Sequence, residues 1–140
     1  MERVDAGYSL EEYVERESRH LDAPLLRLEL ANEMEKLRQG QPWRASGHNA
    51  KTLVKYPDLR IVLIALKRGA RLGEHATKGR ISIQTLDGHV RLKLTDQVVD
   101  LPAGYLLGLD RLRPHDLEAL EDSAVLLTIS ATRARPHAAP

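Results

Sequence analysis

From residue 51 onward, short runs of valine, isoleucine and leucine recur along the chain, and turn-forming residues separate them. Runs of this length, bounded by proline, glycine and aspartate, are typical of β-strands. The seven strands that this pattern predicts cover residues 52–56, 60–67, 80–86, 89–95, 97–101, 105–109 and 124–130. No helical pattern lies between the runs, so the pattern indicates an antiparallel barrel or sandwich.

The alternation of apolar and polar residues is clearest between positions 81 and 94. Apolar or β-branched residues stand at 81, 83 and 85 and again at 90, 92 and 94, with polar residues between them. Asp87-Gly88 separates the two runs, and glycine readily takes the positive φ that a tight turn needs. The segment therefore predicts a β-hairpin.

Residues 1–44 show the spacing of helices instead. Asp5 or Ser9 could cap a first helix that contains residues 9–21, and Ser9, followed three places later by Glu12, forms a capping-box pattern. Pro24 suits the first turn of a second helix, which Gly40 would end. The apolar residues that would share one face of this second helix are Leu25, Leu28, Met34 and Leu37. Residues 40–49 are predicted to form a loop.

The chain has 140 residues, which is enough for one domain with its own core. The pattern divides it into a helical extension (1–44) that packs on the barrel or on a partner subunit, a β-barrel (45–132) and a flexible tail (133–140). Trp43 is the only tryptophan, and we expect it to pack over the barrel or at a subunit contact. The apolar strand 60–67 suits a shared sheet or a buried barrel wall, and we expect a homodimer.

Composition and charge exclude several classes of function. The formal net charge is +1 with both signs interspersed, which argues against nucleic-acid binding through a broad basic face. There are no cysteines, so disulfides and thiolate metal sites are excluded. The start of the chain is too charged for a signal peptide, and no apolar run approaches the roughly 20 residues of a membrane span. We therefore expect a cytoplasmic protein that binds neither nucleic acid nor membrane.

Two histidines stand at fixed distances from glycines. Gly69 is followed by five residues and then His75, with Gly88 closing that stretch, and His115 stands eleven places after Gly104. These spacings resemble the two motifs of the small single-domain cupins. The resemblance covers roughly half of the chain. With the helical pattern before it, it implies a mainly β fold, a single antiparallel jelly-roll barrel preceded by a helical segment.

The resemblance also implies a metal site that this chain keeps only in part. In the family, three histidines and a glutamate hold a divalent metal inside the barrel. His75 and His115 stand at two of those four positions, whereas Thr77 replaces the second histidine and Ile81 the glutamate. Other motif positions also differ, with Asp110, Leu112 and Ala119 replacing a proline, a glycine and an asparagine.

Weak binding of zinc, nickel, manganese or iron by His75 and His115 is therefore one hypothesis. Residues that could complete such a site are His48, Glu74, His89 and Asp110. The alternative is that both histidines are interior residues satisfied by backbone groups, water or each other. Thr77 is open to two readings, a ligand contact or an ordinary β-branched strand residue, and Ile81 is expected in the core.

Arg111 and Arg113 precede His115 and are also open to two readings. An alternating strand would place both on a solvated edge, opposite to Leu112. Alternatively, one of them reaches over the barrel mouth and pairs with a ligand carboxylate.

Three functions compete on this basis. The first is a binding module, sensory in role, that holds a small molecule beside His75, Thr77 and His115. The second is an enzyme of the isomerase, dioxygenase or decarboxylase type, with or without a metal, acting on a small acid or sugar. The third is a structural or regulatory dimerisation module, with the helical segment as its contact surface. The fold alone does not choose among them.

Overall fold

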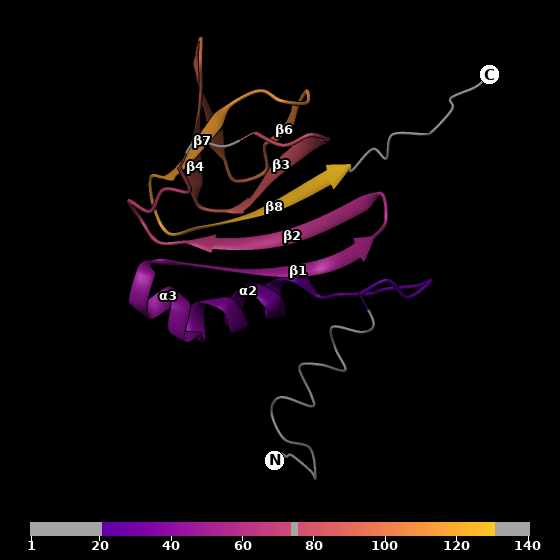
Figure 1. Cartoon of the computed structure of the whole chain (residues 1–140). Coiled ribbons are helices and arrows are strands. Elements are labelled where there is room, and N and C mark those ends of the chain that lie inside the picture. Colours follow the sequence, from indigo (N-terminus) through magenta and orange to yellow (C-terminus); the bar gives the residue numbers. More distant parts are fainter. Residues whose placement is uncertain (1–20, 74–75, 131–140) are drawn as a thin grey trace, which may run out of the picture.

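In a computed structural model, residues 21–73 and 76–130 are described, and they form two antiparallel sheets with two helices before them (Figure 1). The helices are α2 (Leu30–Gln39) and α3 (Gln41–Ser46). The strands are β1 (His48–Tyr56), β2 (Leu59–Leu66), β3 (Arg80–Asp87), β4 (His89–Leu94), β5 (Val98–Pro102), β6 (Leu106–Leu109), β7 (His115–Ala119) and β8 (Ser123–Ser130). The predicted fold class, a mainly β jelly-roll barrel with a helical segment before it, is confirmed.

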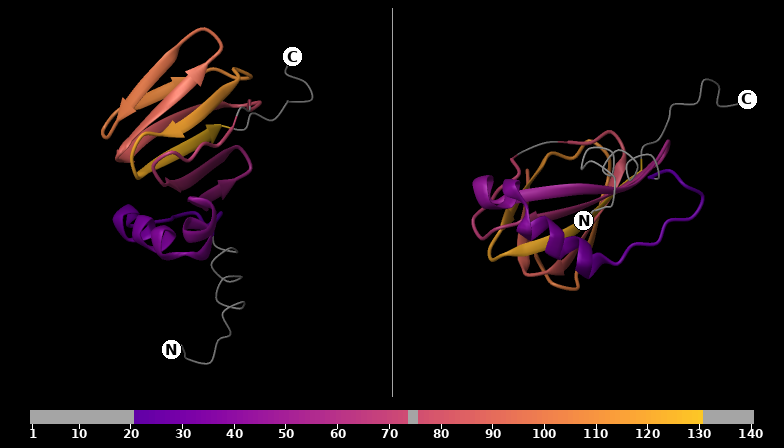
Figure 2. Two further views of the ribbon diagram at one scale, coloured as in Figure 1. Left: turned by 90° about the vertical axis from the view of Figure 1, so that its left-hand side faces the viewer. Right: turned by 90° about the horizontal axis from the view of Figure 1, so that it is seen from below.

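The two sheets face each other and enclose the main core. One has five strands in the order β1-β2-β8-β3-β6, and the other has three in the order β5-β4-β7. The helices lie beside β1 and β2, on the side of the molecule away from β4 and β7 (Figures 1 and 2). None of the helices in these two described ranges is long and apolar enough to cross a membrane.

Strand β2 is apolar on both faces because each face has a different cover. Ile64 and Leu66 point into the barrel core, whereas Leu63 and Ala65 pack in an outer cluster under the helices. Trp43 of α3 is buried in that outer cluster, so the expectation that it packs on the barrel is confirmed. Two roles were expected for this strand, a shared sheet or a buried barrel wall, and in the structure it forms a buried wall. The homodimer stays a prediction.

All seven predicted strands are present, but an eighth, β7, was missed. It runs from His115 to Ala119 and contains two acidic residues, so it lacks the Val/Ile/Leu run by which the others were recognised. Its inward positions are buried because it pairs with β4 and faces the core. The missed strand is the one that carries His115.

The hairpin predicted at Asp87-Gly88 is wrong. β3 pairs with β6 and β8, and β4 pairs with β5 and β7, so the turn carries the chain from one sheet to the other. Gly88 has φ +85°, and a Cβ there would collide with the Asp122 carbonyl and the Ser123 hydroxyl. The glycine is needed, as predicted, but for a crossing between sheets.

The helical predictions need two corrections. The second helix begins at Leu30 and not near Pro24, because residues 25–29 form no helix and their alternating burial places Leu26 and Leu28 against the outer cluster. The predicted loop 40–49 instead holds the short helix α3 and the start of β1. Gly40 does end α2, as predicted. The helix predicted from Ser9 and the predicted tail 133–140 lie outside the described residues, apart from the last residue of that helix.

Candidate functional site

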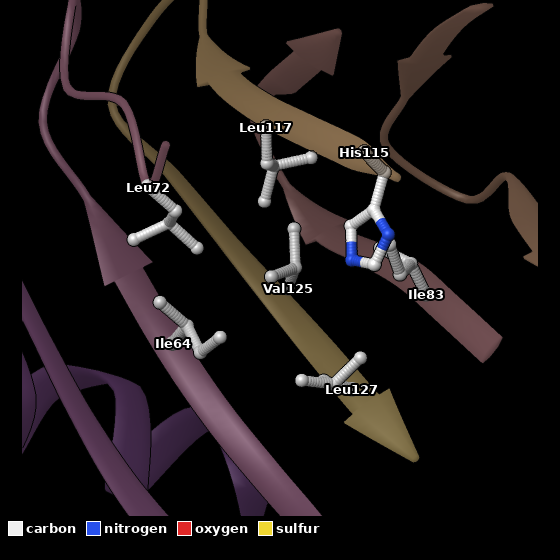
Figure 3. A pocket seen from close by; sticks show the side chains of 7 residues that line it. All are labelled: Ile64, Leu72, Ile83, His115, Leu117, Val125 and Leu127. Atoms are coloured by element: carbon white, nitrogen blue, oxygen red, sulfur yellow. The ribbon is translucent and has the colours of Figure 1, made fainter. Parts of the chain in front are cut away.

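A partly open cavity lies between the two sheets, at the centre of the barrel (Figure 3). A water-sized sphere can be centred within about 20 Å³ of it, and all of the empty space, counted with the part that is open to solvent, is about 270 Å³. Strands β2, β3, β7 and β8 and the segment after β2 contribute its lining. Within 21–73 and 76–130, the lining residues are Ile64, Leu72, Ile83, His115, Leu117, Val125 and Leu127. Six of the seven are aliphatic, so the imidazole is the one polar side chain among them.

His115 is the first residue of β7, and its side chain is directed inward. The residue is only 3% exposed, and in Figure 3 its ring points into the space between the aliphatic side chains. Its Nδ1 lies 2.9 Å from the backbone carbonyl oxygen of Arg113. A carbonyl oxygen only accepts hydrogen bonds, so in the neutral ring Nδ1 carries the proton and Nε2 the lone pair. The backbone before β7 thus fixes both the orientation and the tautomer of the ring.

Ile81, at the position of the family's glutamate, is 5% exposed in the inner core, as predicted. Thr77 is not a strand residue, and that expectation is wrong. It lies before β3, where its hydroxyl donates to the Gly79 carbonyl oxygen at 3.1 Å, and its own carbonyl accepts the Leu112 N–H at 2.8 Å. The backbone of Thr77 therefore joins two loops.

Of the residues considered as additional metal ligands, the three that the structure describes are not gathered at His115. Asp110 is exposed, and its carboxylate accepts from the Arg111 N–H and from Arg80 Nε at 2.8 and 2.9 Å. These two bonds lower the pKa of Asp110. His89 is at the opposite end of β4 from Leu94, the residue paired with His115, so about 17 Å of strand separates them.

His48 is exposed at the start of the edge strand β1. Glu74 and His75 lie outside the described residues. In the ranges 21–73 and 76–130 no three His, Cys, Asp or Glu side chains come together as a metal site would require. The described residues therefore do not fit the family's four-ligand set, and we derive no chemistry through a metal.

Arg111 and Arg113 lie in a turn and a loop, not in the alternating strand that was expected. Arg113 pairs with Asp96 at 3.1 Å, and Arg111 is exposed. Sequence reasoning missed the residue between them. Leu112 has φ +62°, a left-handed conformation that is uncommon for residues other than glycine.

Comparisons with known proteins identify the architecture. No family model matches the chain, and no curated protein matches it in sequence. Among solved structures it is similar to a cupin superfamily protein from Desulfitobacterium hafniense, with TM-score 0.59, 18% identity and coverage of 61% of this chain and 78% of the other. A cupin-2 domain protein from Shewanella frigidimarina gives TM-score 0.60, 13% identity and coverage of 74% and 93%. The fold is a cupin barrel.

A third similar structure is a conserved Streptococcus pyogenes protein of unknown function, with TM-score 0.60, 24% identity and coverage of 64% of this chain and 79% of the other. At these identities the likeness shows the cupin fold and no particular activity. Within the cupin motifs, Gly69, Gly88 and Gly104 all have positive φ. Leu112 stands where the motif has a further glycine and also has positive φ. Leu112 thus has a backbone conformation that favours glycine at a position where the motif has glycine, and that departure in residue type is the signal that points to Leu112.

Proposed function

We propose that this cupin binds a small, mainly apolar molecule with one hydroxyl or similar donor group, in the barrel cavity beside His115. The observation that carries the proposal is the single oriented imidazole among six aliphatic side chains. Such a lining favours apolar surface, and one fixed polar group sets the orientation of the ligand.

The chemistry of the lining narrows the ligand further. A charged group would lose its hydration in this cavity without finding an opposite charge among the lining residues, which is costly. The imidazole of His115 is the polar group that can orient a neutral ligand there, and a hydrogen bond is stronger in apolar surroundings than in water. The ligand is therefore expected to be neutral when bound.

Binding without turnover is also favoured by this lining. General acid–base catalysis commonly needs two proton-transferring groups or a nucleophile near a base. Among the lining residues that the structure describes there is one imidazole and no hydroxyl, amine or carboxylate. A sensory or carrier role fits this lining better than a catalytic one.

Matched alcohol and hydrocarbon probes test the proposal. In protein with ¹³C-labelled Ile, Leu and Val methyl groups, 4-methylphenol, cyclohexanol and 3-methylbutan-1-ol are titrated beside toluene, cyclohexane and 2-methylbutane. We expect at least one alcohol to shift the methyl signals of Ile64, Val125 and Leu127 saturably, and more tightly than its hydrocarbon partner. One hydrogen bond to the ring corresponds to roughly fivefold in affinity.

Two variants and a metal analysis make the test specific. His115→Phe should abolish the preference for the alcohol, whereas the control Leu127→Met, which conserves volume, should keep it. The proposal is overturned if no probe shifts these methyl signals in the folded wild type, or if His115→Phe keeps the preference. Stoichiometric metal in untagged protein, lost in His115→Phe and accompanied by turnover of a small acid or sugar, would favour the enzyme hypothesis instead.

A further inference from the structure

The cavity, as it stands, is too small for the ligand that we propose. A water-sized sphere can be centred within about 20 Å³ of it, which is room for about one water molecule. Cyclohexanol and the other probes are several times larger than water. A wall of the cavity must therefore move outward before such a molecule can be held there.

One part of the wall is better placed to move than the rest. Leu72 belongs to residues 69–73, which we call the strap and which lie between β2 and β3 (Figure 3). Every other described lining residue belongs to β2, β3, β7 or β8, and each of these strands is paired in one of the two sheets. The strap is thus the part of the described wall that lies outside the named strands.

A short ladder holds the strap against β7. Arg71 and Glu118 face each other across it. Two hydrogen bonds of 3.0 Å flank this pair, one donated by the Leu72 N–H and the other by the Ala119 N–H. The Gly69 N–H donates a third bond to β7, at 2.8 Å. Because this ladder is short, its opening is expected to cost less free energy than the opening of a strand inside either sheet.

The side chains of Arg71 and Asp116 add an ion pair between the strap and β7. Asp116 is 8% exposed, and its Oδ2 accepts from Arg71. Its Oδ1 is buried and has no hydrogen-bond partner among the described residues, which is costly. Detachment of the strap would let water reach this carboxylate, and that hydration would offset part of the ion pair that is lost.

Glycines stand at both ends of the strap. Gly69 has φ +86° and Gly73 has φ +80°. At Gly69 no atom of the described residues lies within 4 Å of a Cβ built there, so packing does not require the glycine. Glycine takes positive and negative φ about equally readily, and hinges are residues that absorb large changes in φ and ψ. Both ends of the strap can therefore act as hinges.

We propose that the strap is the gate of the cavity. It leaves β7, turning at Gly69 and Gly73, and carries Leu72 outward, so that a small, mainly apolar molecule can enter and be covered by Leu72. This inference rests on the proposed function, because it requires that a molecule larger than water occupies the cavity. It does not depend on which group of the ligand contacts His115.

A reversible disulfide tests the gate, since the wild type has no cysteines. Arg71→Cys/Glu118→Cys joins the strap to β7 at the opposed pair. The flanking hydrogen bonds make this a non-hydrogen-bonded pair, whose Cα atoms lie about 4.5 Å apart, and a disulfide can span that distance. We expect the oxidised variant to lose cyclohexanol binding, as judged by titration of the Ile64 and Val125 methyl signals, and reduction to restore it.

A matched disulfide on the far side of β4 is the control. Arg91→Cys/Asp100→Cys also replaces an arginine and an acidic residue that face each other in the three-stranded sheet, but it joins β4 to β5 and leaves the strap free to move. This variant should bind cyclohexanol equally in its oxidised and reduced forms.

Amide hydrogen exchange tests the movement without any ligand. The N–H groups of Leu72 and Ala119 connect the strap with β7, so in the wild type they should exchange faster than the amides of β8, which is paired on both sides. Arg71→Gln removes the ion pair and should speed their exchange about two- to fivefold, as expected for a partly exposed pair. Arg91→Gln removes the ion pair with Asp100 and should leave both rates unchanged.

Two binding results would overturn the proposal. The oxidised Arg71→Cys/Glu118→Cys variant could bind cyclohexanol as tightly as its reduced form, or the oxidised control could lose binding as well. If no probe binds the wild type, the proposed function fails, and hydrogen exchange then decides on the strap by itself, as it does if the disulfide does not form. Exchange of Leu72 and Ala119 as slow as that of β8 would overturn the gate, whereas faster exchange that responds to Arg71→Gln would support a strap that detaches.

Discussion

Alternate residues of β2 belong to two apolar clusters, one on each side of the strand. The two clusters differ in what borders them. The outer cluster gathers Leu63 and Ala65 with Leu37 and Trp43 of the helices. Its border is polar, with Arg38 and Lys67 over the Trp43 ring, at 5.7 and 5.5 Å from the ring centre. The inner cluster contains a cavity with a histidine in its lining.

The difference shows which part of the molecule serves stability and which serves binding. The helices of the same chain cover the outer cluster. The ion pair between Lys51 and Glu33, at 2.9 Å, connects α2 with β1. The inner cluster borders a cavity, because the aliphatic side chains around His115 leave space between them. We infer that substitutions in the outer cluster change the free energy of unfolding, and that substitutions around the cavity also change binding.

The largest expected effect is that of Trp43→Ala. It removes the largest side chain of the outer cluster, which is 8% exposed, and we expect a loss of about 3–5 kcal/mol in the free energy of unfolding. Urea denaturation followed by circular dichroism measures it, with Leu25→Ala as the exposed control. Binding of a cavity probe to the folded fraction should stay unchanged. A loss below about 1 kcal/mol would mean that the helices contribute little to the stability of the barrel.

A smaller and more specific effect distinguishes neighbouring residues on β2. Leu63→Ala should cost about 2–5 kcal/mol, because that residue is fully buried in the outer cluster. Ile64→Ala should cost less than Leu63→Ala, since Ile64 already borders empty space, and it should increase affinity for bulky probes such as cyclohexanol. Denaturation and methyl titration of both variants make the comparison. Equal costs, with no change in probe preference, would remove the distinction between the two clusters.

The barrel could be predicted from the sequence because its strands leave a local signal. Alternation placed Ile81, Ile83 and Val90 in the core, and all three are buried there. The hairpin at Gly88 could not be predicted correctly, since the alternation fits either pairing and only the packing of two sheets decides between them. Strand β7 was missed because it is held by pairing with β4 and not by its own composition.

The candidate site was predicted in part. The spacing from Gly104 identified His115, and its inward position agrees with the hypothesis of an interior residue. The aliphatic lining could not be found from the motif, because Ile64, Val125 and Leu127 come from strands that the motif does not include. The left-handed backbone of Leu112 could not be predicted from the sequence, because leucine is not a residue type that indicates this conformation. It becomes visible only when the position is compared with the family's glycine.

The smallest expected effect lies at residues 110–114, the rim loop between β6 and β7, and depends on pH. The Arg111 N–H and the Arg80 guanidinium lower the pKa of Asp110 below its ordinary value of 3.8. A carboxylate with a depressed pKa stabilises the fold above its unfolded pKa, and this contribution is lost as the pH falls through its folded pKa. Asp110→Asn should therefore lower the melting temperature slightly at pH 7, and the difference from the wild type should disappear well below pH 3.8. Thermal melts from pH 7 to pH 2 measure this, with the exposed turn residue Asp58→Asn as control. A difference that persists at the acid end would show that the rim loop is held by something other than this ion pair.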